Sequence, residues 1–415
     1  MTSLRNVAAL IAAVTIMQMG QGLMGVHLPL AFAADGYSRA ALGLVAAAYS
    51  AGFMLGAVAA TAMLARVGHI RVFAASAAVL SVMTLALHGA GEVWAWALDR
   101  AIMGAGVAFM FAAVESWMGA SIDRGERGHV MGIYMVATKA ALAIGPFFSL
   151  GFPADAPEPW MIAAAITAIA MVPVCFTTAA QPEAPQPHPL ALREQFATAP
   201  AAVIAAFGAG MVNTGMMTLA PLFAAERYGP DSAMSFYAAA WIGSLLLQWP
   251  AGRLSDVVDR RVVIAGLTGL AAIAAAALAL WGGQIPFWGA MAVFAVWGAG
   301  GLSFYGLGVA HMADRAEPSK IAQAASGLLF VWAAGSILGP VAQGLVVDLL
   351  GTGGIFWFGA AIALALTLAM FWRGAARQAA EPEAKEPYAA KTETSVAAAE
   401  IAYGKGQAPL EERAP

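Results

Sequence analysis

Residues 233–251, AMSFYAAAWIGSLLLQWPA, form a long apolar run, and residues 252–261, GRLSDVVDRR, form a short charged loop directly after it. A helix that crosses the hydrocarbon core of a bilayer needs about 20 mostly apolar residues. The same alternation of a long apolar run and a short polar loop recurs along the chain. This pattern predicts a helical protein that crosses a membrane many times.

The composition agrees with that interpretation. Of the 415 residues, 61% are hydrophobic and 11% are charged, and the mean hydropathy is +0.74. A soluble domain carries about 25% charged residues, so this chain lacks the charge to cover a water-exposed surface. The net charge of −3 offers no strong field to nucleic acids. The composition excludes a soluble enzyme with one anchor, a nucleic-acid binder and a disordered scaffold.

Twelve apolar runs can be marked, and none alternates as the strands of a membrane barrel would. We expect an all-α integral membrane protein with twelve transmembrane helices in two six-helix bundles. The first bundle spans residues 1–180, a Pro-rich cytoplasmic linker 181–198, the second bundle 199–374, and a disordered cytoplasmic tail 375–415. The runs lie at about 7–32, 41–64, 70–91, 93–119, 128–150, 159–178, 199–223, 233–251, 261–282, 286–310, 322–347 and 353–372.

The loop charges predict the orientation. Lys and Arg concentrate in the cytoplasmic loops of membrane proteins. One set of loops, with the N-terminus and the stretch after the last run, holds thirteen basic residues, whereas the opposite loops hold only Arg39 and Arg227. We therefore expect both termini in the cytoplasm, and a multi-pass protein of the bacterial inner membrane.

The two halves repeat each other at a spacing of 191–194 residues. Because each half has six helices, an even number, both halves begin on the same side of the membrane. The repeat is therefore parallel, with its axis along the membrane normal. The matched pairs are Asp123–Glu126 with Asp314–Glu317, Gly104–Gly106 with Gly298–Gly300, Gly145-Pro146 with Gly339-Pro340, and Pro29-Leu30 with Pro221-Leu222.

Over about residues 5–375 the chain resembles a transporter of the major facilitator superfamily. The loop Gly252–Arg261 is similar to the family's G-x-L-a-D-R-x-G-R-R motif, with Val257 and Asp259 where Arg and Gly are usual. The first-half copy, residues 65–71, lacks the acidic residue. Arg100–Gly106 resembles the family's R-x-x-x-G-x-G signature, and Gly145-Pro146 resembles the end of an antiporter signature. The resemblance implies two bundles that rock about a central site.

Three charged residues fall inside or at the edge of predicted helices, where charge is costly and marks a pathway by default. Glu115 is a candidate coupling residue or substrate ligand, or else a structural partner of a cytoplasmic arginine. Lys139, about 16 Å into its helix, either faces a central cavity, where it binds substrate or pairs with Glu115, or forms a buried structural pair. Arg100 is tied to coupling by the family resemblance, or else anchors the helix end with Asp99.

Uncharged side chains complete the predicted substrate site. Gln21 and Asn213 occupy equivalent places in the two halves, and amides bind a substrate without burying a charge; the alternative is hydrogen bonding between helices. Tyr134 and Trp332 are aromatic candidates for contact with substrate. The six histidines are scattered, so we expect no metal site, and no phosphate-binding loop or other cofactor signature occurs.

Gating is predicted at two kinds of position. Arg253, Asp256, Arg260 and Arg261 would close the inner side of the carrier, and the Gly-Pro pairs Gly145-Pro146 and Gly339-Pro340 would supply bending points, since proline loosens a helix. For the other glycines, such as Gly104, Gly106, Gly298 and Gly300, the interpretation is close helix packing.

The sequence predicts a monomeric secondary transporter and not an enzyme. It would move a small anionic or zwitterionic molecule by alternating access, with protons as the candidate coupling ion. One alternative is proton-driven efflux of many lipophilic compounds. Another is a membrane enzyme or a sensor that transports nothing.

Overall fold

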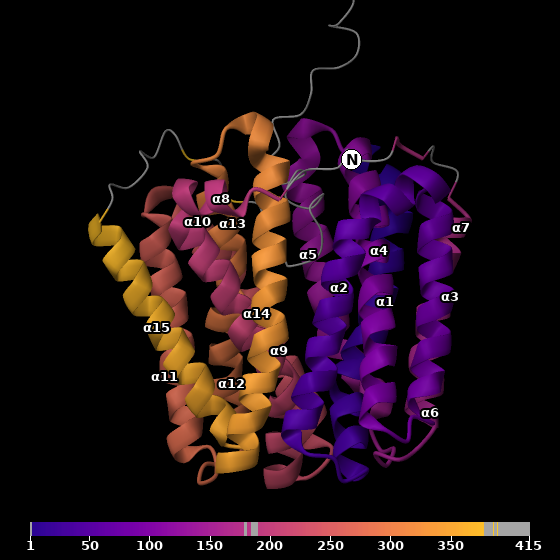
Figure 1. The fold of residues 1–415 in the computed structure, drawn as a ribbon, viewed down its shortest axis with the longest axis vertical. Coiled ribbons are helices and arrows are strands. Elements are labelled where there is room, and N and C mark those ends of the chain that lie inside the picture. The colour runs from indigo at the N-terminus through magenta and orange to yellow at the C-terminus, as the bar shows by residue number, and fades with distance from the viewer. Residues whose placement is uncertain (1, 178–180, 184–189, 377–384, 386–387, 389–415) are drawn as a thin grey trace, which may run out of the picture.

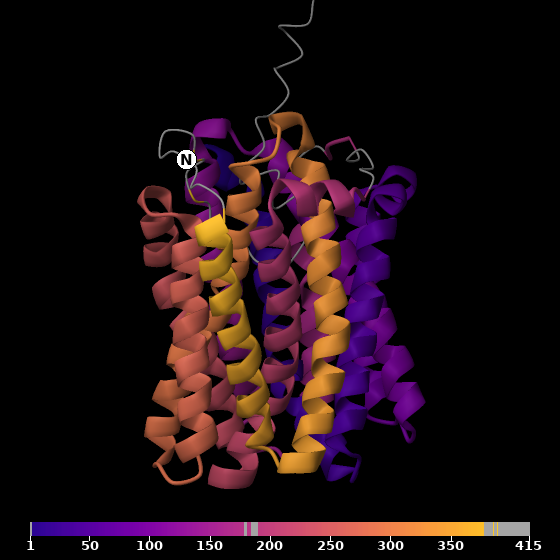
Figure 2. The ribbon, with the colours of Figure 1, turned by 60° about the vertical axis from the view of Figure 1, so that its left-hand side comes forward.

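The computed structural model describes residues 2–177, 181–183, 190–376, 385 and 388. Throughout that part of the chain the secondary structure is helical, with no strand. The helices run roughly along the long axis of the molecule (Figures 1 and 2). In the first half they are α1 (Thr2–Ala34), α2 (Arg39–Val67), α3 (His69–Leu87), α4 (Val93–Ser121), α5 (Arg127–Ile144), α6 (Glu158–Ile169) and α7 (Met171–Cys175), with the 3-10 turns η1 (Arg124–Glu126) and η2 (Gly145–Ser149).

The second half repeats this order after a short linker helix, α8 (Leu192–Thr198). We call the end of the molecule next to α8 the linker end, and the other the far end (Figure 1). The helices of this half are α9 (Pro200–Tyr228), α10 (Ser232–Val257), α11 (Arg260–Trp281), α12 (Phe287–Gly301), α13 (Phe304–Ala313), α14 (Ile321–Leu350) and α15 (Gly354–Ala376), with η3 (Pro318–Lys320).

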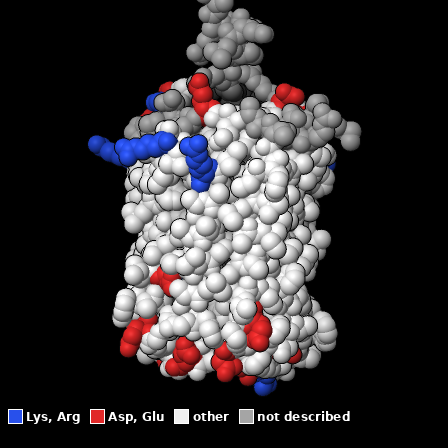
Figure 3. Space-filling model, turned by 90° about the vertical axis from the view of Figure 1, so that its right-hand side faces the viewer, with Lys and Arg blue, Asp and Glu red and all other residues white. Residues whose placement is uncertain are grey.

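Eleven segments of the described chain are long and apolar enough to cross a membrane. The twelfth predicted span corresponds to α10, which packs against α9 and α12 and carries Gln248, Arg253 and Asp256 in its second half. These polar residues make α10 less apolar than the others. Figure 3 shows a broad uncharged belt on one face, with acidic side chains gathered toward the far end. The all-helical membrane fold is thus as predicted.

Close helix contacts repeat between the halves with the same offset as the sequence. A Cβ placed on Gly145 would lie 2.1 Å from the Met19 oxygen, and one on Gly339 would lie 2.2 Å from the Met211 oxygen. Met211 follows Met19 by 192 positions, which is the predicted spacing. Glycine at these positions lets the backbones of neighbouring helices touch. The pseudo-symmetry of the two bundles therefore rests on equivalent backbone contacts.

A second pair of contacts makes the same point. A Cβ on Gly104 would lie 2.0 Å from the Tyr49 oxygen, and one on Gly298 would lie 2.2 Å from the Ala240 oxygen. The first pair joins α4 to α2 and the second joins α12 to α10. Close packing of membrane helices, as predicted for these glycines, is what the structure shows.

Three runs expected to be continuous are interrupted. The run at 128–150 changes from α5 to the turn η2 at Gly145-Pro146, and the run at 159–178 breaks at Ala170. Pro173 explains the second break, because proline cannot donate to the carbonyl four residues earlier, that of Ile169. The run at 286–310 breaks at Leu302–Ser303, after a glycine-rich stretch. These positions correct the expectation of unbroken helices.

The predicted boundaries of the two bundles, the linker and the tail stay predictions. The described part of the linker region contains α8, whose Gln195 donates to the Gln323 carbonyl oxygen at 2.9 Å. Most of the predicted tail, residues 375–415, lies outside the described residues, as do residues 178–180 and 184–189 of the linker region.

Candidate central binding site

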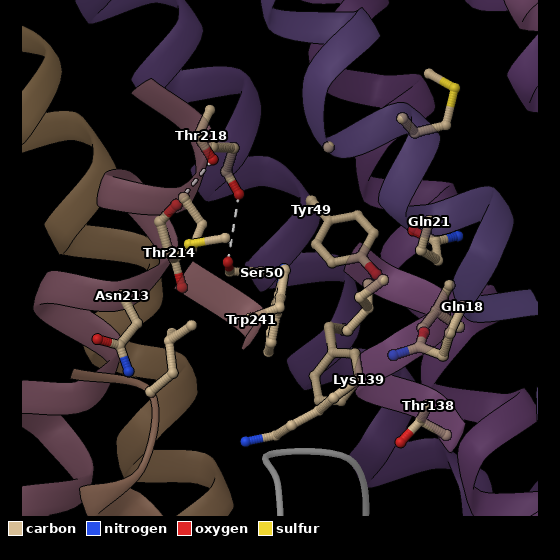
Figure 4. Close-up of a pocket in the computed structure, with 18 of the residues that line it drawn as sticks. Gln18, Gln21, Tyr49, Ser50, Thr138, Lys139, Asn213, Thr214, Thr218 and Trp241 are labelled. Carbon is tan, nitrogen blue, oxygen red and sulfur yellow. Dashed lines mark hydrogen bonds between the residues drawn. The ribbon is translucent and has the colours of Figure 1, made fainter. Parts of the chain in front are cut away.

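A cavity of about 270 Å³ lies between the two bundles. Helices of both halves line it, and Figure 4 shows Gln18, Gln21 and Thr138 facing Asn213 and Thr214 across it. Six of the residues predicted for binding or coupling meet at this cavity: Lys139, Gln21, Asn213, Tyr134, Trp332 and Arg100. Among the described residues that line it, two are basic and none is acidic.

Lys139 connects the two bundles at this cavity. Its side chain leaves α5 nearly fully buried, and its Nζ donates to Ser244 Oγ at 2.6 Å and to Gln248 Oε1, both on α10. The ammonium also lies 6.0 Å from the centre of the Trp241 ring. Buried charge is tolerated where hydrogen bonds satisfy it. The structure places Lys139 on the cavity wall, with its ammonium reaching across to the second bundle.

Arg100 forms another part of the cavity wall. Its guanidinium carbon lies 4.1 Å from the centre of the Tyr49 ring, and its Nη1 donates to Met103 Sδ at 4.0 Å. The Nε atom is buried and has no hydrogen-bond partner among the described residues. Arg100 thus lines the cavity from α4, and it also interacts electrostatically with Asp99, its partner in the alternative considered above.

Glu115 lies behind the cavity wall. The side chain is fully buried, and the Tyr134 hydroxyl donates to its Oε1 at 2.7 Å. Tyr134 itself lines the cavity, so one hydrogen bond separates the carboxyl group from the cavity. Glu115 is thus connected to the cavity through Tyr134, and its role as a coupling residue or substrate ligand stays a prediction.

Asn213 sits at the break between α12 and α13. Its Nδ2 donates to the Gly301 oxygen at 2.8 Å, while its Oδ1 is buried without a partner among the described residues. Ser244 donates to the Leu302 oxygen at 3.2 Å. Broken helices in membranes persist where side chains satisfy the freed backbone groups. Asn213 and Ser244 therefore hold an irregular backbone segment open toward the cavity.

Trp332 closes the cavity from α14. Its ring lies edge-on to Phe53 of α2, with centroids 5.9 Å apart, and its Nε1 is buried without a partner among the described residues. Gln21 lines the cavity from α1 (Figure 4). Both residues therefore present polar groups beside the cavity.

Two of the predicted gating residues, Arg260 and Asp256, belong to a charge cluster at the linker end of the second bundle. Arg260 donates to both carboxylate oxygens of Asp314, at 2.7 and 3.1 Å, and both side chains are about 1% exposed. Asp256 accepts from Arg260 at 3.3 Å. Bidentate contacts of this kind are the strong ones. This cluster joins α10, α11 and α13, and so stays within one bundle.

The neighbouring basic residues have separate contacts. Arg261 binds Asp259 at 2.6 Å and donates to the Arg373 oxygen at 2.7 Å. Partial burial alone raises the pKa of Asp259, but hydrogen bonds from the Arg261 side chain and amide outweigh it, so the pKa lies below its ordinary value. Arg253 stacks on the Trp249 ring at 3.9 Å.

The two Gly-Pro pairs differ in setting. Gly145-Pro146 lies where α5 gives way to η2, whereas Gly339-Pro340 lies inside the continuous helix α14. Both glycines pack against the equivalent helix of their own bundle. A role as bending points remains a prediction for both, with only the first at a helix end.

No sequence motif predicted the contacts between the bundles at the far end. The Asp348 carboxylate on α14 accepts from the backbone amides of Arg39 at 2.8 Å and Ala40 at 2.9 Å, at the start of α2. Arg39 also pairs with Glu226 of α9 at 2.7 Å. A carboxylate at a helix N-terminus is favourable, because the amides there lack partners in the helix. These contacts join the two bundles.

Ser244 and Tyr49 are the other residues that the motifs did not indicate. A serine or a tyrosine in an apolar helix gives little signal, since each is also common in ordinary packing. Within the described residues no group of three or more His, Cys, Asp or Glu side chains is placed to hold a metal ion.

Two helical bundles that enclose a shared cavity, lined by apolar residues and a few polar ones, are typical of a membrane carrier. The family model of the Major Facilitator Superfamily matches residues 10–304 and 230–410, and the chain belongs to this family of transporters. It is 25% identical over 373 residues to an uncharacterized MFS-type transporter, YfkF, of Bacillus subtilis, covering 88% of this chain and 93% of the relative. It is 23% identical over 351 residues to the uncharacterized MFS-type transporter YcaD of Escherichia coli, covering 82% and 88%.

Solved structures of the family share the fold. The nucleoside transporter NupG matches with a TM-score of 0.72 and 14% identity over 88% of this chain and 99% of the other. The D-xylose-proton symporter matches with a TM-score of 0.71 and 14% identity over 92% and 98%. At these identities the likeness concerns the fold.

Proposed function

We propose that this transporter carries a small anionic or zwitterionic molecule through the cavity between its bundles by alternating access. The observation that carries the proposal is the placement of Arg100 and Lys139 on the same cavity, with the neutral donors Gln21 and Asn213 beside them. Two cations that face one small space favour a ligand with negative charge, and the amides add hydrogen bonds without further charge.

Contacts between the bundles support an assignment to a state closed at the far end. A Cβ on Gly43 would lie 2.2 Å from the Pro340 oxygen, and one on Gly344 would lie 2.3 Å from the Arg39 oxygen. At these glycines the backbones of α2 and α14 touch, close to the point where the Asp348 carboxylate accepts from the Arg39 amide. We place the linker end, with both termini, in the cytoplasm of a bacterial inner membrane, as the loop charges favour.

Protons are the coupling ion that we propose. Glu115 is a buried carboxyl group one hydrogen bond from the cavity, through the Tyr134 hydroxyl. An ionisable group inside a membrane protein marks a proton or ion path by default. The family includes a D-xylose-proton symporter with the same fold, which is consistent with this coupling.

The substrate class can be tested by thermal unfolding of the purified transporter with succinate, glutamate, glucose, thymidine or tetraphenylphosphonium. We expect succinate or glutamate to raise the Tm, and the rise to shrink in Arg100→Gln and Lys139→Gln. Arg71→Gln is the matched control, since Arg71 is exposed and outside the cavity. A rise in Tm with glucose or thymidine alone would overturn the proposal of an anionic or zwitterionic substrate. A rise with tetraphenylphosphonium alone would favour multidrug efflux.

A further inference from the structure

A small pocket lies at the linker end of the second bundle and shares no lining residue with the central cavity. The starts of α9 and α11 and the ends of α13 and α15 surround it. Its basic lining residues are Arg261, His311, Arg315 and Arg373, and no acidic residue is among the described residues that line it. Positive charge therefore gathers here without a carboxylate in the pocket wall.

Two of these side chains have no hydrogen-bond partner in the part of the chain that the structure describes. His311 lies in the last turn of α13, and its side chain is buried. Arg373 lies in the last turn of α15, half-buried, and no described carboxylate pairs with its guanidinium. Arg261, by contrast, is already bound to Asp259. Buried polar groups are normally hydrogen-bonded, so His311 and Arg373 leave a place for an acceptor.

The start of α9 lies on the same pocket. This helix is 29 residues long and begins at Pro200, and Ala199, Pro200 and Ala201 all line the pocket. A helix N-terminus carries about half a positive charge, and its first amides lack partners in the helix. Pro200 has no amide hydrogen, so Ala201 offers the first donor. An imidazole, a guanidinium and a helix N-terminus together favour an oxyanion such as a phosphate group.

The size and position of the pocket narrow the form of that ligand. Its free space is about 10 Å³, which is close to what one water-sized group needs. An oxyanion can therefore place one oxygen in the pocket while the rest of the ligand stays outside. Phe371 and Trp372, directly before Arg373, are largely exposed, as aromatic side chains at a membrane surface are. Basic pockets between helices on the cytoplasmic side suit anionic lipid headgroups.

We propose that this pocket binds a phosphate group, which a headgroup of an anionic lipid or a free phosphate ion can supply. One phosphate oxygen accepts from His311 and Arg373 and so ties the ends of α13 and α15 to the start of α9. The lipid-facing side chains next to Arg373 favour the lipid as the source. The transport function proposed above does not require this site, so the inference goes beyond it.

Thermal unfolding of the full-length transporter in detergent tests the site without any transport measurement. Dioleoylphosphatidylglycerol, dioleoylphosphatidylcholine or sodium phosphate is titrated in, and sodium chloride keeps the ionic strength constant. We expect phosphatidylglycerol to raise the Tm of the wild type more than phosphatidylcholine does, because only phosphatidylglycerol carries a net negative charge. In Arg373→Gln the half-maximal rise should need about tenfold more phosphatidylglycerol, the lower end of the cost of losing a hydrogen bond to a charged group.

Arg71→Gln is the matched control. Arg71 is exposed near the start of α3, at the same end of the molecule but outside the pocket, and the variant removes the same charge. It should respond to phosphatidylglycerol as the wild type does. Arg373→Gln removes no described polar contact of the guanidinium, so we expect it to fold, and its Tm without added lipid checks this. His311→Leu should weaken the response in the same direction.

The two sources of phosphate give different results. A response to phosphatidylglycerol that weakens in Arg373→Gln, with one lipid fewer retained in native mass spectrometry, identifies the lipid headgroup. A response to sodium phosphate alone that weakens in Arg373→Gln identifies the free ion in the same pocket. Equal responses of Arg373→Gln and Arg71→Gln to both ligands would overturn the phosphate site, whatever the protein transports.

Discussion

The two bundles share a backbone plan and differ in where they carry charge. In the first bundle, Arg100, Glu115 and Lys139 lie at or just behind the central cavity. In the described helices of the second bundle, Lys, Arg, Asp and Glu occur only in the turns near the helix ends. The second bundle contributes neutral polar side chains such as Asn213, Thr214 and Thr218 to the cavity wall. The difference teaches that the first half carries the charged side chains of the cavity, whereas the second half lines it with neutral ones.

The linker ends show the converse difference. Arg260 begins α11 and binds Asp314, whereas the equivalent position at the start of α3 is His69, whose Nε2 lies 3.0 Å from Ser116 Oγ. A buried ion pair in one bundle thus replaces a neutral hydrogen bond in the other. The sequence already indicates this difference, because the first-half copy of the loop motif, residues 65–71, lacks the acidic residue.

The largest expected effect comes from breaking the ion pair. Removing one partner of a buried pair leaves an uncompensated charge and costs about 3–5 kcal/mol, so Arg260→Ala should lower the stability of the transporter strongly. His69→Ala removes a neutral hydrogen bond and should cost only about 1 kcal/mol. Denaturant unfolding in detergent measures both. Equal losses would contradict the assigned asymmetry between the linker ends.

The shared backbone plan predicts equal effects at equivalent glycines. A Cβ on Gly52 would lie 1.8 Å from the Ala101 oxygen, and one on Gly243 would lie 1.9 Å from the Ala295 oxygen. Overpacking of this kind costs about 1–3 kcal/mol, so Gly52→Ala and Gly243→Ala should lower the Tm alike. Gly266→Ala is the control, because nothing lies within 4 Å of its added Cβ, and it should be neutral or stabilising. A loss in only one bundle would contradict equivalent packing.

The far-end contacts predict a smaller effect that acts on conformation. Arg39 and Glu226 are partly exposed, and exposed ion pairs are worth about 0.2–1 kcal/mol. Glu226→Gln should therefore change the Tm little. Because the pair joins the bundles, the variant should increase labelling of Thr138→Cys from the far end by about two- to fivefold. Glu183→Gln, a linker-region change, is the control. Unchanged far-end labelling would show that this pair does not hold the bundles together.

The smallest effect concerns pH at Asp259. Its pKa is lowered in the folded protein, so the stabilisation it provides is fully present above the unfolded pKa of about 3.9 and is lost as the pH falls through the folded pKa. The wild type should therefore be more stable than Asp259→Asn at pH 7, and the gap should narrow toward pH 3. Thermal unfolding at both pH values measures it. A gap that does not change with pH would contradict the assignment.

Much of the fold was predictable because lipid restricts the choices. Apolar run length, loop charge and a fixed repeat offset are each read directly from one chain, and bilayer-spanning segments satisfy their backbone groups internally. The helix breaks were harder to predict. The interruption at Leu302–Ser303 depends on Asn213 and Ser244, which lie on other helices and satisfy the carbonyls of Gly301 and Leu302.

The site was predictable in its charged members for a related reason. Lys139 and Arg100 stand out because charge inside a membrane is rare and costly. The polar partners do not stand out, since Ser244 and Tyr49 are ordinary residues in apolar helices. The depth of Glu115 behind Tyr134, and the contacts of Asp348 with α2, depend on how helices rotate against each other, which residue spacing along one chain does not determine.

The most direct test of the central claim is counterflow in proteoliposomes. A radiolabelled anion that stabilises the wild type should exchange across the membrane without a gradient, as a carrier allows and an enzyme or sensor does not. A hydrogen bond to a charged group is worth about 1.5–3 kcal/mol, so Lys139→Ala should lower the exchange rate about 10- to 100-fold, while Arg71→Gln leaves it unchanged. Full exchange by a correctly folded Lys139→Ala protein would contradict the proposed site.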